Sequence, residues 1–154
     1  MRRYWDADMG EFERSAWGLV EEAEAEIESI TVEALEQELN ESEDERKNRN
    51  EPIVVDIRDI REVWIEGSIP GAEHAPRGMI EFWADPDTEY YRDFFDPGNR
   101  YVLYCNEAGR SALAAKRLGE MGYEDVSHLE GGFTAWQEAG GDVIDVPQKD
   151  YTDR

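Results

Sequence analysis

Short apolar runs alternate along this chain with stretches whose apolar residues recur at helical spacing. The runs at 53–57 and 101–104 are too short for helices, so they predict buried strands of a parallel sheet. Further short strands are predicted near 27–30, inside 64–72 after a turn, and at 125–129. Helices are predicted at 31–39, within 76–83, at 112–118 and from 131 onward. This alternation indicates one α/β domain on a parallel sheet, without an internal repeat.

The two ends of the chain and one internal segment depart from this pattern. Residues 1–28 place apolar positions at helical spacing among many glutamates, which predicts an acidic amphipathic helix that extends the domain. We expect this helix to pack on its own domain, and docking of a partner is the alternative. The run 40–51 is polar throughout and predicts a mobile loop, while 146–154 predicts a polar tail. The domain itself is expected to span 29–145.

Charge is the most unusual feature of the composition. The 154 residues carry a net charge of −22, with three lysines against thirteen arginines, and the acidic residues are spread along the whole sequence. This composition resembles that of cytoplasmic proteins from salt-loving archaea, whereas a chain with acidic tails would show only a local excess. The charge argues against nucleic acid and membranes as partners. No apolar stretch reaches the roughly 20 residues of a membrane span, and no signal-peptide core is found, so a cytoplasmic protein is expected.

The only cysteine, Cys105, follows the run 101–104 and precedes a helical pattern. We therefore expect it at the carboxyl end of a strand, where open α/β sheets bind ligands. A single cysteine excludes an internal disulfide and a multi-cysteine zinc site, and no metal or cofactor is expected. The loop 105–110 must turn back into the helix, so its N–H groups and the helix N-terminus should form a nest for an anionic sulfur. Gly109 would supply backbone freedom to that loop.

Two charged residues at the end of the predicted strand 53–57 are expected to have a structural role. Asp56 and Arg58 are two positions apart, so they would lie on one side of the strand and orient neighbouring loops by charge-assisted hydrogen bonds. Further along, the polar connection 85–95 is long enough to cover a site, and Arg77 could reach an anion there.

The two histidines, His74 and His128, are assigned structural roles. Histidine is the commonest general base, but its place in a sequence does not show contact with a thiol, and no Cys-His signature lies near either residue.

Five short motifs follow one another in a characteristic order. They are Asp56-Ile-Arg58, Gly67-Ser-Ile-Pro-Gly-Ala72, Val102-Leu-Tyr-Cys105, Gly109-Arg-Ser-Ala-Leu-Ala-Ala115 and Leu129-Glu-Gly-Gly-Phe-Thr-Ala-Trp136. With these motifs, residues 29–145 resemble a single rhodanese domain, of the thiosulfate sulfurtransferase family. The resemblance implies a parallel five-stranded sheet with helices on both faces, and a persulfide carried on Cys105. It further implies a small anionic sulfur donor such as thiosulfate, and cyanide, a thiol or a protein as acceptor.

The resemblance assigns roles to the residues of the loop. The Cys105 thiolate would attack the outer sulfur of the donor and sulfite would leave. The anionic donor would be held by Arg110 and by the loop amides. The loop consists of Asn106, Glu107, Ala108 and Gly109. Ser111 is interpreted first as a helix cap and second as a hydrogen-bond donor to the sulfur.

Three positions depart from the pattern of that family. Ser68 stands where histidine is common, and Ala108 stands where many members have glycine. Glu107 is an acid in a loop that should receive an anion, so it would disfavour thiosulfate unless it points to solvent, by an amount that salt would screen.

Two other functions compete with sulfur transfer. Phosphatases and arsenate reductases of related fold place five residues between the cysteine and the arginine, whereas Cys105 and Arg110 are separated by four. The shorter loop fits one sulfur atom better than a phosphate. The second alternative is a sulfur-carrier or binding module without turnover, whose N-terminal helix docks a partner.

Overall fold

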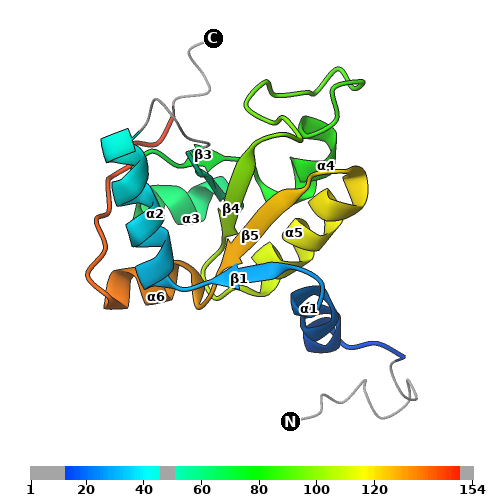
Figure 1. Cartoon of the computed structure of the whole chain (residues 1–154), viewed down its shortest axis with the longest axis horizontal. Coiled ribbons are helices and arrows are strands. Elements are labelled where there is room, and N and C mark those ends of the chain that lie inside the picture. The colour runs from blue at the N-terminus through cyan, green and yellow to red at the C-terminus, as the bar shows by residue number, and fades with distance from the viewer. Residues whose placement is uncertain (1–12, 46–50, 150–154) are drawn as a thin grey trace.

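The computed structural model describes residues 13–45 and 51–149, and its centre is a five-stranded parallel sheet. The strand order is β1-β5-β4-β2-β3, and every pair of neighbours is parallel (Figure 1). The strands are β1 Glu28–Ile30, β2 Ile53–Asp56, β3 Glu73–His74, β4 Arg100–Tyr104 and β5 Asp125–Leu129. The predicted parallel five-stranded α/β fold with helices on both faces is therefore confirmed.

Helices cover both faces of the sheet. They are α1 Ala16–Glu24, α2 Val32–Glu45, α3 Ile60–Glu66, α4 Ile80–Trp83, α5 Gly109–Met121 and α6 Gly132–Glu138, and a 3-10 turn, η3 Arg77–Met79, precedes α4. Figure 1 shows α2 and α6 on one side of the sheet and α4 and α5 on the other. None of the helices in the described part of the chain has the length and apolar character needed to cross a membrane.

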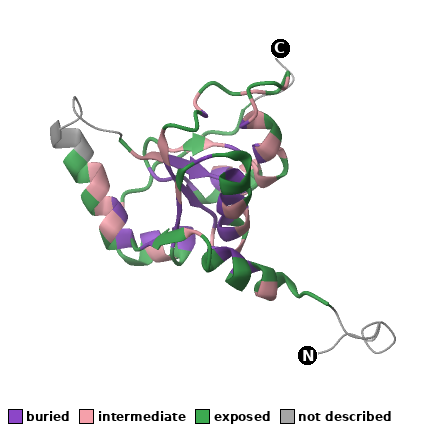
Figure 2. Cartoon of the chain, turned by 45° about the vertical axis from the view of Figure 1, so that its right-hand side comes forward, coloured by how far each residue is buried: buried purple, intermediate pink, exposed green. Residues whose placement is uncertain are grey.

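The core divides into two halves because side chains of a strand alternate between its faces. Along β4, Tyr101 and Leu103 pack with α5, while Val102 and Tyr104 pack with α2 and α6. The strands form the buried centre of the molecule (Figure 2). Since β4 has partners on both edges and helices on both faces, the residue that follows it is held rigidly.

Helix α1 packs on α5 rather than on the sheet. Val20 and Ala23 of α1 form a small apolar cluster with Ala112 of α5. Ser15 begins the helix, because its hydroxyl accepts a hydrogen bond from the Gly18 N–H at 2.9 Å. The helix is shorter than the predicted 1–28 segment, whose first 12 residues lie outside the described residues.

The prediction of a loop at 40–51 is wrong at its start, because α2 continues to Glu45. The run contains neither glycine nor proline before Pro52, and its glutamates are good helix formers, so polarity alone does not end the helix. Residues 46–50 of that predicted loop lie outside the described residues.

The prediction of a turn and a short strand within 64–72 is also wrong, because residues 64–66 end helix α3 and the strand β3 begins only at Glu73. Asp59 and Glu62 form a capping box, in which each side chain accepts a hydrogen bond from the other residue's backbone N–H. This signal is visible in the sequence as an acid followed three positions later by a glutamate. It places Glu62 on the first turn of a helix beside the end of β2.

Candidate active site

Cys105 lies directly after β4, where its side chain is buried. The backbone N–H of Ala108 donates a hydrogen bond to its Sγ at 3.1 Å. The loop then enters α5, whose N-cap is Ala108 and whose first residue is Gly109. The sulfur therefore lies at the carboxyl end of a central strand and at the N-terminus of a helix, and both the N–H group and the helix dipole favour a negative charge there.

The residue with the unusual backbone conformation in this loop is Ala108, and not Gly109 as predicted. Ala108 has a φ of 86°, and it is the only non-glycine residue with a positive φ in the described part of the chain. Gly109 instead starts the helix, and a methyl group on it would lie 3.1 Å from the Trp17 ring of α1. The glycine allows the Trp17 ring to approach closely, and the alanine has the left-handed conformation.

Ser111 is fully buried on the first turn of α5. Its Oγ lies 3.7 Å from Cys105 Sγ, 3.2 Å from the Ala108 carbonyl oxygen and 3.0 Å from His128 Nδ1. The N-cap position belongs to Ala108, which has no side chain to cap the helix. The prediction that Ser111 caps the helix is therefore wrong, and its hydroxyl faces the sulfur.

Arg110 is paired with a carboxylate in this structure. Its two terminal nitrogens donate to the two carboxylate oxygens of Glu62, at 2.9 and 3.0 Å. These hydrogen bonds are the main reason why the pKa of Glu62 is lowered, and they raise the pKa of Arg110, which the nearby Cys105 raises further. An incoming anion would have to compete with a carboxylate that is already bound in bidentate fashion.

Asp56 and Arg58 lie beneath the loop as a buried ion pair. Arg58 donates to both Asp56 carboxylate oxygens, at 2.9 and 2.6 Å, and to the Gly67 carbonyl oxygen at 2.7 Å. Its remaining terminal nitrogen donates to Asn106 Oδ1 at 3.1 Å. The guanidinium also stacks over the Phe133 ring at 4.3 Å. These contacts hold the Arg58 guanidinium in one position. Its hydrogen bond to Asn106 therefore orients that side chain at the start of the loop.

Asn106 connects this buried pair to the ion pair at the mouth of the site. Its amide nitrogen donates to Glu62 Oε1 at 2.9 Å, while its oxygen accepts from Arg58. Glu62 thus bonds two residues of the loop, Asn106 and Arg110, from a different helix. No sequence pattern indicates this role of Glu62, although the capping box predicts the helix that carries it.

The surroundings of Glu107 and Arg77 differ from those that a role in binding the donor would require. The Glu107 side chain is exposed, so the acid that was expected to disfavour thiosulfate lies at the surface, and Glu62 is the acid bound to the arginine. Arg77 forms an ion pair with Glu81 at 3.0 Å. The structure thus shows no contact between Arg77 and the loop 105–111 among the contacts of the described residues.

The histidines differ in their relation to the sulfur. His74 Nε2 lies 2.7 Å from the Arg58 carbonyl oxygen, in agreement with a structural role. His128 is fully buried, and it contacts Ser111, which faces Cys105. Sequence patterns did not reveal this contact, because His128 and Ser111 are on separate elements that meet only in the folded sheet.

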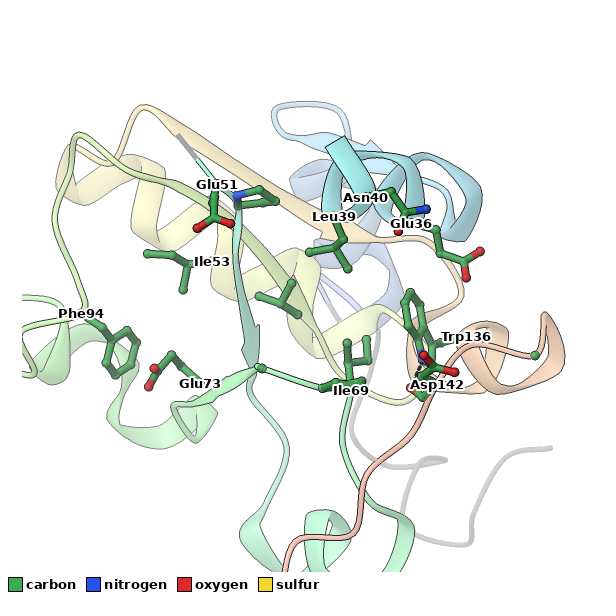
Figure 3. A pocket seen from close by; sticks show the side chains of 15 residues that line it. Glu36, Leu39, Asn40, Glu51, Ile53, Ile69, Glu73, Phe94, Trp136 and Asp142 are labelled. Atoms are coloured by element: carbon green, nitrogen blue, oxygen red, sulfur yellow. Dashed lines mark hydrogen bonds between the residues drawn. The ribbon is translucent and has the colours of Figure 1, made fainter. Parts of the chain in front are cut away.

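A cavity of about 650 Å³ lies away from this site. It is bordered by α2, the start of β2 and α6, with Leu39, Ile53, Ile69 and Trp136 among its lining residues (Figure 3). No residue of the loop 105–111 lines it. Among the residues that the structure describes, no group of three or more His, Cys, Asp or Glu side chains is arranged to hold a metal ion.

The order of strands and the loop around Cys105 agree with one known family. Residues 33–139 match the model of the Rhodanese-like domain. The chain belongs to the rhodanese-like domain family. Thiosulfate sulfurtransferase GlpE of Pseudoalteromonas translucida (strain TAC 125) is 30% identical over 98 residues, which cover 64% of this chain and 85% of that protein.

Two other relatives of this rhodanese-like domain are longer proteins. The uncharacterized protein slr1261 of Synechocystis sp. (strain ATCC 27184 / PCC 6803 / Kazusa) is 34% identical over 57% of this chain, and the match spans 44% of its length. YrkF of Bacillus subtilis (strain 168), which bears the name of a sulfur carrier protein, is 27% identical over 71% of this chain and 51% of its own length. The chain thus matches about half of each of these two relatives.

Two solved structures of similar fold carry different functional names. A Rhodopseudomonas palustris CGA009 protein, RPA3614, described as of unknown function and a possible tyrosine phosphatase, superposes with a TM-score of 0.77 and 39% identity, over 87% of this chain and 97% of that one. The polysulfide-sulfur transferase homodimer of Wolinella succinogenes gives a TM-score of 0.62 and 27% identity, over 82% and 85% of the two chains.

Proposed function

We propose that this rhodanese-like domain is a sulfurtransferase that carries a sulfur atom as a persulfide on Cys105. The observation that supports this most directly is the environment of Sγ, which receives the Ala108 N–H at 3.1 Å and faces the Ser111 hydroxyl at the N-terminus of α5. Such an environment favours an anionic sulfur over an uncharged one. The names of GlpE and of the Wolinella transferase support the same chemistry.

The reaction has two halves that regenerate the thiolate. In the first half, the Cys105 thiolate attacks the outer sulfur of a donor such as thiosulfate. The bond between the two donor sulfurs breaks, sulfite leaves with its electron pair, and a persulfide anion remains on the enzyme. In the second half, an acceptor such as cyanide attacks the outer sulfur of the persulfide, the S–S bond breaks, and thiocyanate leaves the thiolate behind. Cys105 is the only cysteine of the sequence, so the acceptor must come from outside the chain.

Arg110 would take part in the first half by holding the anionic donor, together with loop amides. Because Arg110 is bound to Glu62, the donor would have to bind the guanidinium beside this carboxylate or displace it. The natural donor is therefore one that either outcompetes Glu62 or carries less negative charge than thiosulfate.

Two observations favour other functions. The name of RPA3614 includes a possible tyrosine phosphatase, and its structure is similar to this one. The spacing argues against that function. Four residues separate Cys105 from Arg110, and a loop of this length fits one sulfur atom better than a tetrahedral phosphate. The name of YrkF favours a carrier without turnover. Repeated release of thiocyanate from thiosulfate and cyanide would distinguish an enzyme from a carrier, which would release at most one equivalent.

The intact mass of the protein after incubation with thiosulfate in high salt tests the proposal. We expect a gain of one sulfur atom, removal of that sulfur by cyanide, and no gain in Cys105→Ala. No gain with thiosulfate or with polysulfide would refute the persulfide mechanism. Hydrolysis of an aryl phosphate that is lost in Cys105→Ser would favour the phosphatase instead.

We further infer a cytoplasmic protein adapted to high salt, with the domain at 29–145 between an N-terminal extension and a C-terminal tail. The net charge of −22 supports the salt adaptation, because self-repulsion destabilises the folded state until counterions screen it. The urea midpoint of unfolding should rise steadily with potassium chloride. Equal stability in dilute buffer and in concentrated salt would contradict the inference.

A further inference from the structure

A chain of polar contacts runs from the sulfur of Cys105, after the central strand β4, to the edge strand β1. Ser111 Oγ lies 3.7 Å from Cys105 Sγ and 3.0 Å from His128 Nδ1. On the other side of the imidazole, His128 Nε2 lies 3.0 Å from Ser29 Oγ. Ser111 and His128 are fully buried, whereas Ser29 is exposed on β1, the edge strand. The chain therefore connects the active-site loop with β5 and β1.

The number of protons in this chain limits what Ser111 can do. Its hydroxyl has one proton, and three groups compete for it: Cys105 Sγ, the Ala108 carbonyl oxygen and an unprotonated His128 Nδ1. If Nδ1 lacks a proton, it takes the hydroxyl proton and the sulfur receives none. If Nδ1 carries the proton, it donates to Ser111, whose own proton is then available to an anionic sulfur.

The surroundings of His128 favour the state in which the ring is neutral and Nδ1 carries its proton. Burial is the main cause that lowers the pKa of His128, so the neutral ring has one N–H at neutral pH. The Ala108 backbone also lies close enough to His128 to raise its pKa, which is the effect of a carbonyl oxygen that faces a ring N–H. That oxygen lies 3.2 Å from Ser111 Oγ, which is the neighbour of Nδ1. With Nδ1 protonated, Nε2 accepts from the Ser29 hydroxyl.

The charged groups near His128 are acidic. Glu24 of α1 has an oxygen 3.6 Å from Nε2, which is beyond ordinary hydrogen-bond length, and its side chain is 42% exposed. Glu130, directly after β5, opposes the effect of burial on the pKa of His128. The Ser29 hydroxyl lies closer to Nε2 than Glu24 does, at 3.0 Å. Ser29 is therefore the hydrogen-bond partner of Nε2, and its hydroxyl can donate to an unprotonated Nε2.

We propose that His128 is a positioning residue that donates its Nδ1–H to Ser111 and thereby directs the Ser111 hydroxyl proton onto the sulfur of Cys105. The sulfur then has two donors, the Ala108 N–H and the Ser111 O–H. The inference deepens the proposed function, because the same donors serve the thiolate that attacks and the persulfide anion that follows. His128 touches neither the donor nor the reacting sulfur.

The pH dependence of Cys105 alkylation by iodoacetamide, followed by intact mass, tests this role without any sulfur donor. Since Cys105 is the only cysteine, the added mass reports this thiol alone. His128→Asn retains an N–H donor near the Nδ1 position, whereas His128→Gln places its amide near the Nε2 position. We expect Ser111→Ala and His128→Gln to move the midpoint of the profile to higher pH by about one unit, the size of one modest hydrogen bond to an anion. His128→Asn should stay close to the parent protein.

The double variant Ser111→Ala/His128→Gln decides whether His128 acts through Ser111. We expect its profile to match that of Ser111→Ala, whereas the sum of two separate shifts would overturn the proposal, as would a His128→Gln profile that superposes on the parent. Should both His128 variants fail to fold, Ser29→Ala on the exposed edge strand replaces them. It removes the hydroxyl that donates to Nε2, so a shift to higher pH supports the proposal and an unchanged profile overturns it.

Persulfide formation from thiosulfate is measured separately on the parent protein. A shifted alkylation profile in a protein that gains no sulfur would refute the proposed function and leave the role of His128 intact. Sulfur gain together with unshifted alkylation profiles would refute the role of His128 and leave the proposed function intact.

Discussion

Replacing Glu62 by glutamine should make this protein a better acceptor of sulfur from thiosulfate. Glu62 occupies both terminal nitrogens of Arg110, the residue proposed to hold the donor. Glutamine keeps one oxygen, which can accept from Arg110 and from the Asp59 N–H of the capping box, whereas its amide nitrogen replaces the oxygen that accepts from Asn106, and the negative charge is removed. The variant therefore changes the charge next to the donor site and leaves the shape of the site nearly intact.

The size of the effect follows from the distances. A donor oxygen on Arg110 would lie within about 6 Å of the Glu62 carboxylate, twice a hydrogen-bond length, since the guanidinium would lie between them. A dianion and a carboxylate at about 6 Å repel by roughly 1.4 kcal/mol in water, and a half-exposed ion pair contributes up to about 1 kcal/mol more. We expect a gain of about 1–2 kcal/mol at low salt, or roughly 5- to 30-fold in the second-order rate of sulfur loading.

Single-turnover loading of Cys105, read as the gain of one sulfur in the intact mass, measures this rate. Glu138→Gln on the exposed end of α6 is the matched control, because it makes the same change in net charge away from the site. In 1 M salt the Debye length falls to about 3 Å, so the advantage of Glu62→Gln should shrink to about twofold. An equal rate for Glu62→Gln and the parent at low salt, with loading intact in both, would refute the idea that Glu62 opposes an anionic donor.

Three further predictions concern the loop and the residues packed beneath it. Ala108→Gly should raise the free energy of unfolding by about 0.5–1 kcal/mol in urea titrations, because glycine adopts the φ of 86° without a steric cost; a lower value would show that Ala108 is not strained. Gly132→Ala should unfold at lower urea than the parent, since a methyl group there would lie 2.5 Å from two carbonyl oxygens of the active-site loop, whereas Gly119→Ala in α5 meets no atom within 4 Å and should be neutral or stabilising. If both alanine variants behave alike, the close approach at Gly132 has no energetic importance. Finally, the folded pKa of His128 is lowered from 6.5, so below about pH 6.5 the unfolded chain binds a proton that the folded chain does not, and the free energy of unfolding should fall as the pH drops below about 6.5. His128→Asn should lack this part of the fall, and parallel curves for the two proteins would contradict the assignment.

The elements with a strong local signal were predictable from the sequence. The strands around 53–57 and 101–104 and the helix after Cys105 follow from apolar runs and spacing that tertiary contacts do not override. Helix α3 was missed although its capping box, Asp59 and Glu62, stands in the sequence, because its apolar stripe is short. The end of α2 was misplaced because a polar, acidic run indicates a loop as readily as a solvent-exposed helix.

The partners within the site could not be predicted in the same way. Arg110 could have paired with any of 38 acidic residues, and the choice of Glu62 depends on how α3 lies beside the loop after the sheet has formed. The contact of His128 with Ser111 likewise joins β5 to α5. Sequence spacing orders residues along one element, whereas these contacts depend on how separate elements pack. The role given to Gly109 was wrong for a related reason, since a left-handed residue at Ala108 has no compositional signal.

The charges around Cys105 separate two functions, stabilising an anionic sulfur and binding an anionic donor. The family resemblance assigns both functions to the same loop. The buried groups, namely the Ala108 N–H, the Ser111 hydroxyl and the N-terminus of α5, all favour a negative charge on the sulfur itself. At the mouth, Glu62 neutralises Arg110. A neutralised arginine attracts a dianion weakly, so donor charge and sulfur charge are controlled by different residues. The alkylation profile should therefore respond most strongly to Ser111 and His128, while the preference for thiosulfate over a less charged donor should respond to Glu62.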